Sequence, residues 1–381
     1  MPPRPLSNAT PGERITGVDG LRGIAILLVL IHHFVELQLP REIGTWQAYL
    51  AAGLGLTFSG VDLFFVISGF LIGGILMDNR DAPNFFQVFY LRRTLRIVPL
   101  FYVFILVCWL LPGRVPGVEH ATYPLACYLG FLCNFWMAAH NTWEAGWPAL
   151  AWSLAVEEQF YLVFPMIVRF CRPSLLLRLT MAALVIGPML RVSILLFAPH
   201  WSLGTHVLAP CRMDSLAFGV LSAVAIRHGG MRSWLIDHPL IPLFIAVALL
   251  PVLAGLTYFR ASLQTMLMAS VGYTVLSLFY AAVLLTVIGR RPSWLVGICE
   301  TKIFVFIGGI SYFIYLFHGL IGWFIFLVVG RKIIALTSFG DVGLILITLL
   351  VVLAAGSCSW ILFESKLISL GRQFRYGSNP T

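Results

Sequence analysis

Residues 21–34 read LRGIAILLVLIHHF, an apolar run with Arg22 near its beginning and His32 and His33 near its end. Such a run predicts a helix that crosses a membrane. Arg22 and His33 are 11 residues apart, close to three turns, so they lie on nearly one face with a rise of about 16 Å between them. His32 points about 100° away from His33. His33 is therefore a candidate functional residue, although a histidine hydrogen-bonded to a neighbouring helix would show the same spacing.

The whole chain has the composition of a membrane protein. Of its 381 residues, 59% are hydrophobic and 11% are charged, whereas a soluble domain carries about 25% charged residues. The net charge of +9 is spread along the loops and predicts no nucleic-acid partner. The seven cysteines form no C-x-x-C pair, so neither a metal site nor a disulfide framework is predicted. Residues 1–20 are polar and lack the features of a signal peptide.

Ten apolar stretches are long enough to cross about 30 Å of hydrocarbon. They lie near residues 21–39, 56–77, 97–112, 150–168, 177–198, 207–226, 238–257, 268–289, 304–329 and 341–362. An eleventh stretch, 123–139, is shorter. If it does not cross and the N-terminus lies inside, eighteen of the 25 lysines and arginines face inside, five face outside and two fall within spans. The positive-inside rule favours that arrangement.

The predicted fold class is therefore all-α, a polytopic membrane helix bundle of about ten transmembrane helices with both termini cytoplasmic. Residues 1–20 form a cytoplasmic tail, residues 21–363 form the membrane domain, and residues 364–381 form a second cytoplasmic tail. Within the membrane domain, residues 113–149 are expected to form an outer-face segment that can re-enter the membrane.

Charged side chains inside membrane spans normally face the protein interior or a water-filled cavity. The second predicted span begins with Ser59 and, three residues later, Asp62. This spacing resembles a helix-capping box, so Asp62 is either a cap or a functional group. Arg92, Arg93 and Arg96 precede the third span. They either follow the positive-inside rule or bind phosphate, whose oxygens suit guanidinium groups.

The fourth predicted span carries Ser153, Glu157 and Tyr161 on one face, spaced four residues apart, with Glu158 beside them. Two adjacent carboxylates in an apolar helix are costly unless they are paired or face water. Packing alone therefore explains them poorly, and Glu158 is a candidate orienting partner of Glu157.

The ninth predicted span carries a second polar stripe of Ser311, Tyr315 and His318. In the sixth span, Arg212 and Asp214 are two residues apart and do not face each other on a helix, so each is expected to contact another helix. The predicted topology places most of these polar groups in the outer half of the membrane: His33, Asp62, Glu157, Glu158, Arg212 and Asp214. It places Tyr315 and His318 near the middle and the arginine triplet at the inner mouth.

Two functions fit this polar pathway. An enzyme would hold a phosphate-bearing donor at the inner arginines and deprotonate an acceptor hydroxyl with a carboxylate-supported histidine. A proton-coupled transporter would use the histidines and glutamates as relay groups and the arginines as a substrate clamp. The sequence shows no matching pair of interrupted segments of the kind common in transporters, which favours the enzyme slightly.

Six pieces of the chain occur in a defined order: Arg22 with His33, GVDLFFVISGFLI at 60–72, RRTLRIVP at 92–99, WSLAVEEQFYLVFP at 152–165, RMDSLAFG at 212–219 and GGISYFIYLFH at 308–318. Together they resemble the acyltransferase 3 family of integral membrane O-acyltransferases. The resemblance implies a multi-pass protein of the bacterial inner membrane, in the stand-alone form without a C-terminal hydrolase-like domain. It implies an acyl-CoA donor, usually acetyl-CoA, and a hydroxyl acceptor on a sugar-containing molecule, such as a cell-envelope polysaccharide, a lipid-linked saccharide or a glycosylated small molecule.

The resemblance also implies roles for individual residues. His33 matches the proposed catalytic histidine, which we expect to act as general base with Glu157 or Asp62 orienting it and Tyr161 completing the catalytic group. Four arginines are expected to bind the donor: Arg22, Arg92, Arg93 and Arg96. The other polar residues are expected to support the pathway: Ser153, Glu158, Arg212, Asp214, Ser311, Tyr315 and His318. No metal is expected.

Overall fold

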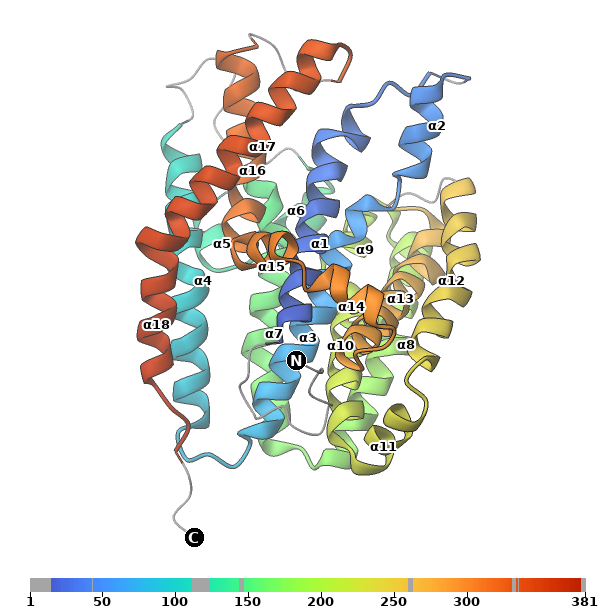
Figure 1. Ribbon diagram of the computed structural model, residues 1–381, viewed down its shortest axis with the longest axis vertical. Coiled ribbons are helices and arrows are strands. Elements are labelled where there is room, and N and C mark those ends of the chain that lie inside the picture. The colour runs from blue at the N-terminus through green and yellow to red at the C-terminus, as the bar shows by residue number, and fades with distance from the viewer. Residues whose placement is uncertain are drawn as a thin grey trace.

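The structure is a computed structural model that describes residues 15–42, 44–111, 124–143, 147–259, 263–330, 334 and 336–377. These residues form helices and no strand, which confirms the predicted all-α fold class. The long helices run beside one another in a bundle (Figure 1). They are α1 (Thr16–Phe34), α3 (Gly60–Asp78), α4 (Phe85–Leu110), α7 (Ala151–Phe170), α8 (Pro173–Phe197), α10 (Ala209–Arg227), α12 (Ile241–Tyr258), α13 (Tyr273–Ile288), α16 (Ser311–Val328) and α17 (Phe339–Ser359).

Within the described part of the chain, nine helical stretches are long and apolar enough to cross a membrane: Thr16–Gln38, Trp46–Asp78, Phe85–Leu110, Pro173–Phe197, Gly204–Arg227, Ile241–Tyr258, Met268–Ile288, Ser311–Val328 and Phe339–Gln373. They correspond to nine of the ten predicted spans. The tenth, predicted at 150–168, forms α7, a helix of 20 residues whose polar stretch 157–159 lowers its hydropathy. The chain is a multi-pass membrane protein.

The prediction of one continuous span over 304–329 is wrong. The chain breaks at Ile310 into α15 (Lys302–Gly309) and α16, and α15 lies across the long helices (Figure 1). The packing of α15 on α1 explains the break, because a Cβ atom at Gly308 would collide with the backbone oxygen of Asp19. A glycine at this position lets α15 approach α1 this closely.

The arginine triplet lies inside a helix rather than before one. The third span was expected to begin at residue 97, but α4 begins at Phe85. Arg92, Arg93 and Arg96 are therefore held on a rigid helical scaffold, and their side chains project from its first half. The capping expectation for Asp62 is wrong as well, because Ser59 makes no side-chain cap bond at the start of α3.

The predicted outer segment 113–149 is described only in part, because residues 113–123 and 144–146 lie outside the described ranges. The rest forms three short pieces: α5 (Leu125–Leu129), α6 (Cys133–His140) and the 3-10 turn η4 (Trp147–Leu150). Each piece is too short to cross a bilayer. Helix α6 packs against α7 and against α9 (Gly204–Val207).

Helical structure extends past both ends of the membrane domain predicted at residues 21–363. Of the tail predicted at 1–20, residues 1–14 lie outside the described ranges, and α1 begins at Thr16. At the other end, helical structure continues beyond residue 363 through the π-helical turn η7 (Trp360–Glu364) and α18 (Ser365–Gln373). Residues 378–381 lie outside the described ranges.

Helices α3 and α10 form the centre of the bundle. In the spans that contain them, 72% and 67% of the apolar window is buried, against 17% for α8 and for α12. Gly69 and Gly219 allow this central contact, because a Cβ atom on either would collide with backbone of the facing helix. Small residues at a helix interface permit the close approach on which membrane-helix packing depends.

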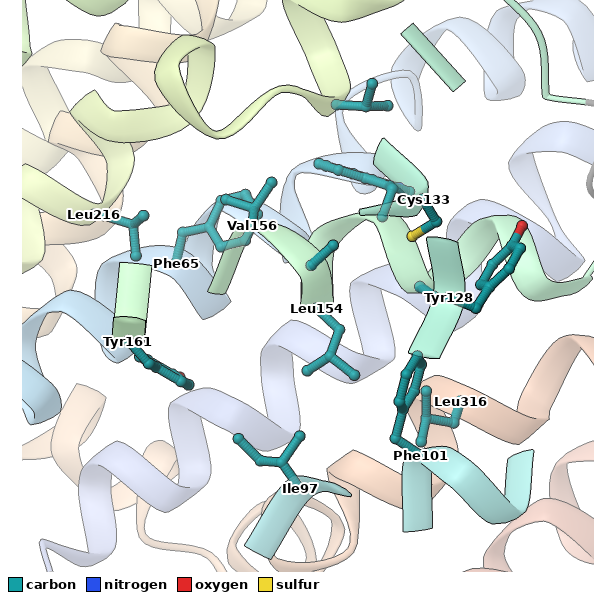
Figure 2. Close-up of a cluster of buried hydrophobic side chains, with 14 of the residues drawn as sticks. Phe65, Ile97, Phe101, Tyr128, Cys133, Leu154, Val156, Tyr161, Leu216 and Leu316 are labelled. Atoms are coloured by element: carbon teal, nitrogen blue, oxygen red, sulfur yellow. The ribbon is translucent and has the colours of Figure 1, made fainter. Parts of the chain in front are cut away.

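Apolar side chains from six long helices, α3, α4, α7, α8, α10 and α16, form the main core beside this centre (Figure 2). Phe65 of α3, Phe101 of α4, Val156 of α7, Leu216 of α10 and Leu316 of α16 all belong to it. The core fixes the relative positions of the helices that carry the polar groups. The remaining elements are short: α2 (Trp46–Gly53), α11 (Gly229–Asp237), α14 (Ser293–Cys299), η2 (Glu36–Gln38), η3 (Thr57–Ser59), η5 (Pro199–Trp201) and the π-helical turn η6 (Met268–Gly272).

Candidate functional site

A cavity of about 650 Å³ opens at the end of the bundle where α1 begins and α3 and α10 end. We call it the arginine cavity because seven arginines line it: Arg22, Arg92, Arg93, Arg96, Arg227, Arg232 and Arg372. Three carboxylates also line it: Asp19, Asp78 and Glu157. The excess of cations makes the cavity a site for an anion.

Arg93 and Arg96 keep their positive charges available for a ligand. Arg227 is neutralised by Asp78, with two contacts of 2.7 Å. In contrast, neither Arg93 nor Arg96 forms an ion pair with any described residue. The guanidinium of Arg93 instead lies 5.5 Å from the centroid of the Tyr161 ring. Arg93 and Arg96 can therefore bind phosphate oxygens without first breaking an ion pair.

Arg22 lies between this cavity and α16. Its Nη2 donates to the hydroxyl of Ser311 at 3.1 Å. The predicted stripes on α1 and α16 therefore face each other at this level.

Glu157 belongs to the arginine cavity and not, as predicted, to the surroundings of His33. Its Oε2 accepts a hydrogen bond of 3.0 Å from Tyr161, and the hydroxyls of Tyr161 and Ser68 are 2.5 Å apart. Because Tyr161 has one hydrogen and gives it to Glu157, Ser68 must be the donor to Tyr161. Glu158 lines neither cavity described here, and its Oε1 is buried without a hydrogen-bond partner among the described residues.

A second cavity of about 560 Å³ lies farther along α1, beside its C-terminal end. We call it the histidine cavity. Its polar and aromatic lining comes from His32, His33, Glu36, Arg41, Trp143, Trp147, Trp152, His206 and Tyr315. Imidazoles supply proton-accepting nitrogens, and the tryptophans supply flat apolar faces with N–H donors. The histidine cavity therefore suits a polar acceptor that also has apolar faces.

The hydrogen bonds of His33 define which of its nitrogens is basic. His33 Nδ1 lies 2.8 Å from the backbone oxygen of Val29. A carbonyl oxygen only accepts, so Nδ1 carries the hydrogen and Nε2 of the neutral ring keeps its lone pair. A general base needs such a nitrogen.

His318 of α16 is the immediate neighbour of His33. The two ring centroids are 4.9 Å apart. Nδ1 of His318 lies 3.0 Å from the oxygen of Ile314 and 2.9 Å from that of Tyr315, so this ring is also unprotonated at Nε2 when neutral. That buried Nε2 has no hydrogen-bond partner among the described residues. Two histidines able to take up a proton therefore lie side by side.

The sequence analysis missed the Glu36 carboxylate beside His32, the histidine that precedes His33 in the chain. His32 Nδ1 lies 2.9 Å from Glu36 Oε2, without the alignment of a hydrogen bond. Arg41 binds the second oxygen of Glu36 at 2.7 Å. The spacing of His32 and Glu36, four residues, was visible in the sequence and would have identified the contact. His206, which also lines the cavity, was missed because no periodic pattern marks it.

Ser153 and Tyr315 lie at the boundary between the two cavities. Their hydroxyl oxygens are 2.5 Å apart, and Tyr315 also donates to the backbone oxygen of Leu150 at 3.1 Å. Ser153 is therefore the donor to Tyr315. On α7, Trp152 lines the histidine cavity and Leu154 lines the arginine cavity. The Ser153–Tyr315 hydrogen bond joins α7 to α16 between residues that line the two spaces, and we call it the partition.

Asp62 and Asp214 are held in buried ion pairs away from His33. Asp62 contacts Arg212 and Ser215, and Asp214 binds Arg191 at 2.8 Å. All four charged side chains of the two pairs are fully buried. The prediction that Arg212 and Asp214 each contact another helix is confirmed. The prediction that Asp62 orients His33 has no support in these contacts, and a structural role explains Asp62 better.

Neither cavity shows a metal-binding group. Among the residues that the structure describes, no three or more His, Cys, Asp and Glu side chains are arranged to hold a metal ion.

The chain is a helical membrane bundle with one cavity lined by arginines and another lined by histidines. The chain belongs to the acyltransferase 3 family, whose description is "Acyltransferase domain" and which matches residues 15–364. It is similar to the protein named "Putative O-acetyltransferase SACOL0978" of Staphylococcus aureus strain COL, with 26% identity over 79% of this chain and 50% of that protein. It is also similar to "O-acetyltransferase OatA" of Staphylococcus aureus strain NCTC 8325, with 30% identity over 41% of this chain and 25% of that protein.

The chain spans about half the length of the first of these relatives. No solved structure matches it.

Proposed function

We propose that this protein is an O-acyltransferase that moves an acyl group, most simply acetyl, from acyl-CoA to a hydroxyl of a sugar-containing acceptor. The observation that carries the proposal is the placement of Arg22 and His33. They lie about three turns apart on α1, and they line different cavities, one rich in arginine and one rich in histidine. A reaction between a phosphate-bearing donor and a neutral acceptor needs two such sites that meet at one point.

The donor would occupy the arginine cavity. Its phosphates would bind Arg93 and Arg96, which have no carboxylate partner among the described residues, with Arg22 and Arg92 contributing further charge. The thioester would reach the partition formed by Ser153 and Tyr315. Membership of the family and the names of the two relatives, "Putative O-acetyltransferase SACOL0978" and "O-acetyltransferase OatA", support the choice of an acetyl group.

The acceptor would occupy the histidine cavity. His33 Nε2 would remove the proton from the acceptor hydroxyl as its oxygen attacks the thioester carbonyl. The new C–O ester bond forms, the C–S bond breaks, and the thiolate leaves on the side of the arginine cavity. His318, beside His33, carries its hydrogen on Nδ1, so it would leave the Nε2 lone pair of His33 free to take the proton.

The distribution of arginines supports an orientation with the arginine cavity on the cytoplasmic side, where acyl-CoA is made. The acceptor side would then face outward from a bacterial inner membrane. The tryptophans of the histidine cavity, Trp143, Trp147 and Trp152, support an acceptor with sugar rings, whose C–H faces pack on indoles while their hydroxyls remain free. A cell-envelope polysaccharide, a lipid-linked saccharide and a glycosylated small molecule all have this chemistry.

The test is acetyl transfer from labelled acetyl-CoA by the purified protein in lipid nanodiscs. The wild-type protein should label a saccharide acceptor, and His33→Ala should lose the transfer by about 10²–10⁴-fold. His238→Ala is the matched control, because His238 makes the same bond from Nδ1 to the backbone oxygen four residues earlier, at 3.0 Å, but lies exposed. Transport of a solute without turnover of the thioester would favour a proton-coupled transporter instead, and full transfer by His33→Ala would remove the proposed base.

A further inference from the structure

A short segment after α18 is tied across the mouth of the arginine cavity. We call it the strap and define it as residues 374–377. Asn84, which precedes α4, binds the strap twice: its Nδ2 donates to the oxygen of Arg375 at 2.9 Å, and its Oδ1 accepts from the amide of Gly377 at 2.8 Å. Arg92 Nε donates to the oxygen of Phe374 at 2.9 Å. The strap lies beyond residue 364, where the family match ends, so the family does not account for it.

Within the strap, Tyr376 alone is turned inward. Phe374, Arg375 and Gly377 are exposed, whereas Tyr376 is partly buried and lines the arginine cavity. Its ring centroid lies 5.3 Å from the guanidinium carbon of Arg92. Its hydroxyl is buried and has no hydrogen-bond partner among the described residues. A polar atom in that state is costly unless a ligand or water completes it.

The chemistry around Tyr376 fits one kind of ligand. An aromatic ring offers a flat surface, the unpaired hydroxyl offers one donor, and Arg92 and Arg372 offer cationic donors at the same mouth. A nucleotide presents the complementary groups, since it has a flat base for stacking and phosphate oxygens for guanidinium groups. A phospholipid headgroup supplies the phosphate but has no flat base to stack on the Tyr376 ring.

We propose that the strap is part of the donor site and that Tyr376 and Arg92 hold the nucleotide end of the phosphate-bearing donor. This rests on the proposed function, in which the donor is an acyl-CoA. The nucleotide base stacks on the Tyr376 ring, the Tyr376 hydroxyl donates to the base or to a phosphate, and Arg92 binds a phosphate. The acyl end then extends past Arg93 and Arg96 toward the partition. Tyr376 touches the donor far from the reacting atoms, so it is a binding residue.

The first experiment compares two donors. Acetyl-CoA carries the nucleotide, and acetyl-pantetheine carries the same thioester without it. In Tyr376→Ala, KM for acetyl-CoA should rise about tenfold, the factor expected from one lost stacking contact. KM for acetyl-pantetheine and both kcat values should stay at the wild-type level.

The controls separate the ring from the fold of the strap. Tyr376→Phe keeps the stacking surface and should show a smaller rise in KM for acetyl-CoA. Arg375→Ala removes an exposed side chain of the strap and keeps its backbone bond to Asn84, so it should behave as wild type. An unchanged KM for acetyl-CoA in Tyr376→Ala would overturn the proposal. An equal rise in KM for both donors would also overturn it, since that pattern reports a general distortion of the cavity.

The second experiment needs no turnover. Adenosine 3′,5′-bisphosphate, the nucleotide fragment of CoA, should bind the wild-type protein and bind about tenfold more weakly to Tyr376→Ala and to Asn84→Ala, which releases the strap. Vesicles of anionic phospholipid should not compete. Equal binding by wild type and Tyr376→Ala, or displacement by the lipid, would overturn the role of the strap alone. Failure of the wild-type protein to transfer acetyl groups would overturn the proposed function, and the bisphosphate measurement would still decide the role of the strap.

Discussion

Replacing Asp62 by asparagine should destabilise the protein strongly without acting on the chemistry. The substitution keeps the shape of the side chain and removes its charge. Asp62 and Arg212 are both fully buried, so Asp62→Asn leaves a guanidinium uncompensated in the centre of the bundle. The Nε and Nη1 atoms of Arg212 have no hydrogen-bond partner among the described residues, which leaves Asp62 as the group that balances its charge there.

The size of the effect follows from this geometry. Breaking a buried pair by removing one partner costs about 3–5 kcal/mol. The stacking of Arg212 on the Tyr273 ring, 3.9 Å from its centroid, remains in the variant and favours the lower end of that range. Since the whole stability of a folded protein is about 5–15 kcal/mol, much of the variant should be unfolded on mild heating.

The assay is thermal unfolding in detergent, followed by size-exclusion chromatography and by the transfer activity of the folded fraction. Asp237→Asn, an exposed acid in α11, is the control. The double variant Asp62→Leu with Arg212→Met removes both charges and should recover most of the stability, because an apolar pair of similar volume replaces a buried ion pair at little cost. Wild-type stability of Asp62→Asn would refute the reasoning. A double variant that is folded but inactive would show that the Asp62–Arg212 pair takes part in the reaction.

Three further predictions concern packing, the partition and pH. Gly219→Ala should destabilise the contact between α3 and α10 by about 1–3 kcal/mol, whereas Gly255→Ala, with no atom near its added Cβ, should not; equal unfolding temperatures would contradict this. Tyr315→Phe removes the hydrogen bond between Ser153 and Tyr315. The rate of acetyl-CoA hydrolysis without acceptor should then rise about fivefold, as expected for one lost hydrogen bond, and an unchanged rate of hydrolysis would show that this bond does not separate the cavities. Hydrogen bonds from Arg290 hold the pKa of Glu300, outside the spans, below its usual value. Glu300→Gln should therefore unfold at a lower temperature than wild type at pH 7, and this difference in unfolding temperature should close as the pH falls below about 4. A difference that persists in acid would contradict the prediction.

Periodicity in the sequence predicted which residues of a helix share a face. The stripe of Ser311, Tyr315 and His318 does face the stripe of Arg22 and His33, with Ser311 beside Arg22 and His318 beside His33. Two helices that run side by side need only matching periods to bring such stripes together. The approximate number of long helices was also predictable, because bilayer thickness sets the length that an apolar stretch needs to cross the membrane, and such stretches can be counted in the sequence.

The sequence did not predict at which level along the bundle each polar side chain lies, or which side chain of another helix it contacts. The predicted topology placed Glu157 and His33 together in the outer half of the membrane. In the structure they line different cavities, and Tyr161 binds Glu157 on the arginine side. A single sequence does not show which turns of two helices cross. The break at Ile310 depends on glycines that fit against α1, and this fit exists only once the helices are packed.

In the proposed function, the separation of donor binding and proton removal into two cavities organises the site. It is tested most directly by the single-turnover rate of acetyl transfer, measured against acetyl-CoA concentration, in His33→Ala and in Arg93→Ala with Arg96→Ala. His33→Ala should half-saturate at the wild-type concentration with a maximal rate lowered by at least about 100-fold. The arginine variant should keep the maximal rate and half-saturate at a concentration about 100-fold higher. A loss of donor affinity in His33→Ala, or an unchanged half-saturation in the arginine variant, would contradict the division of the site into two cavities.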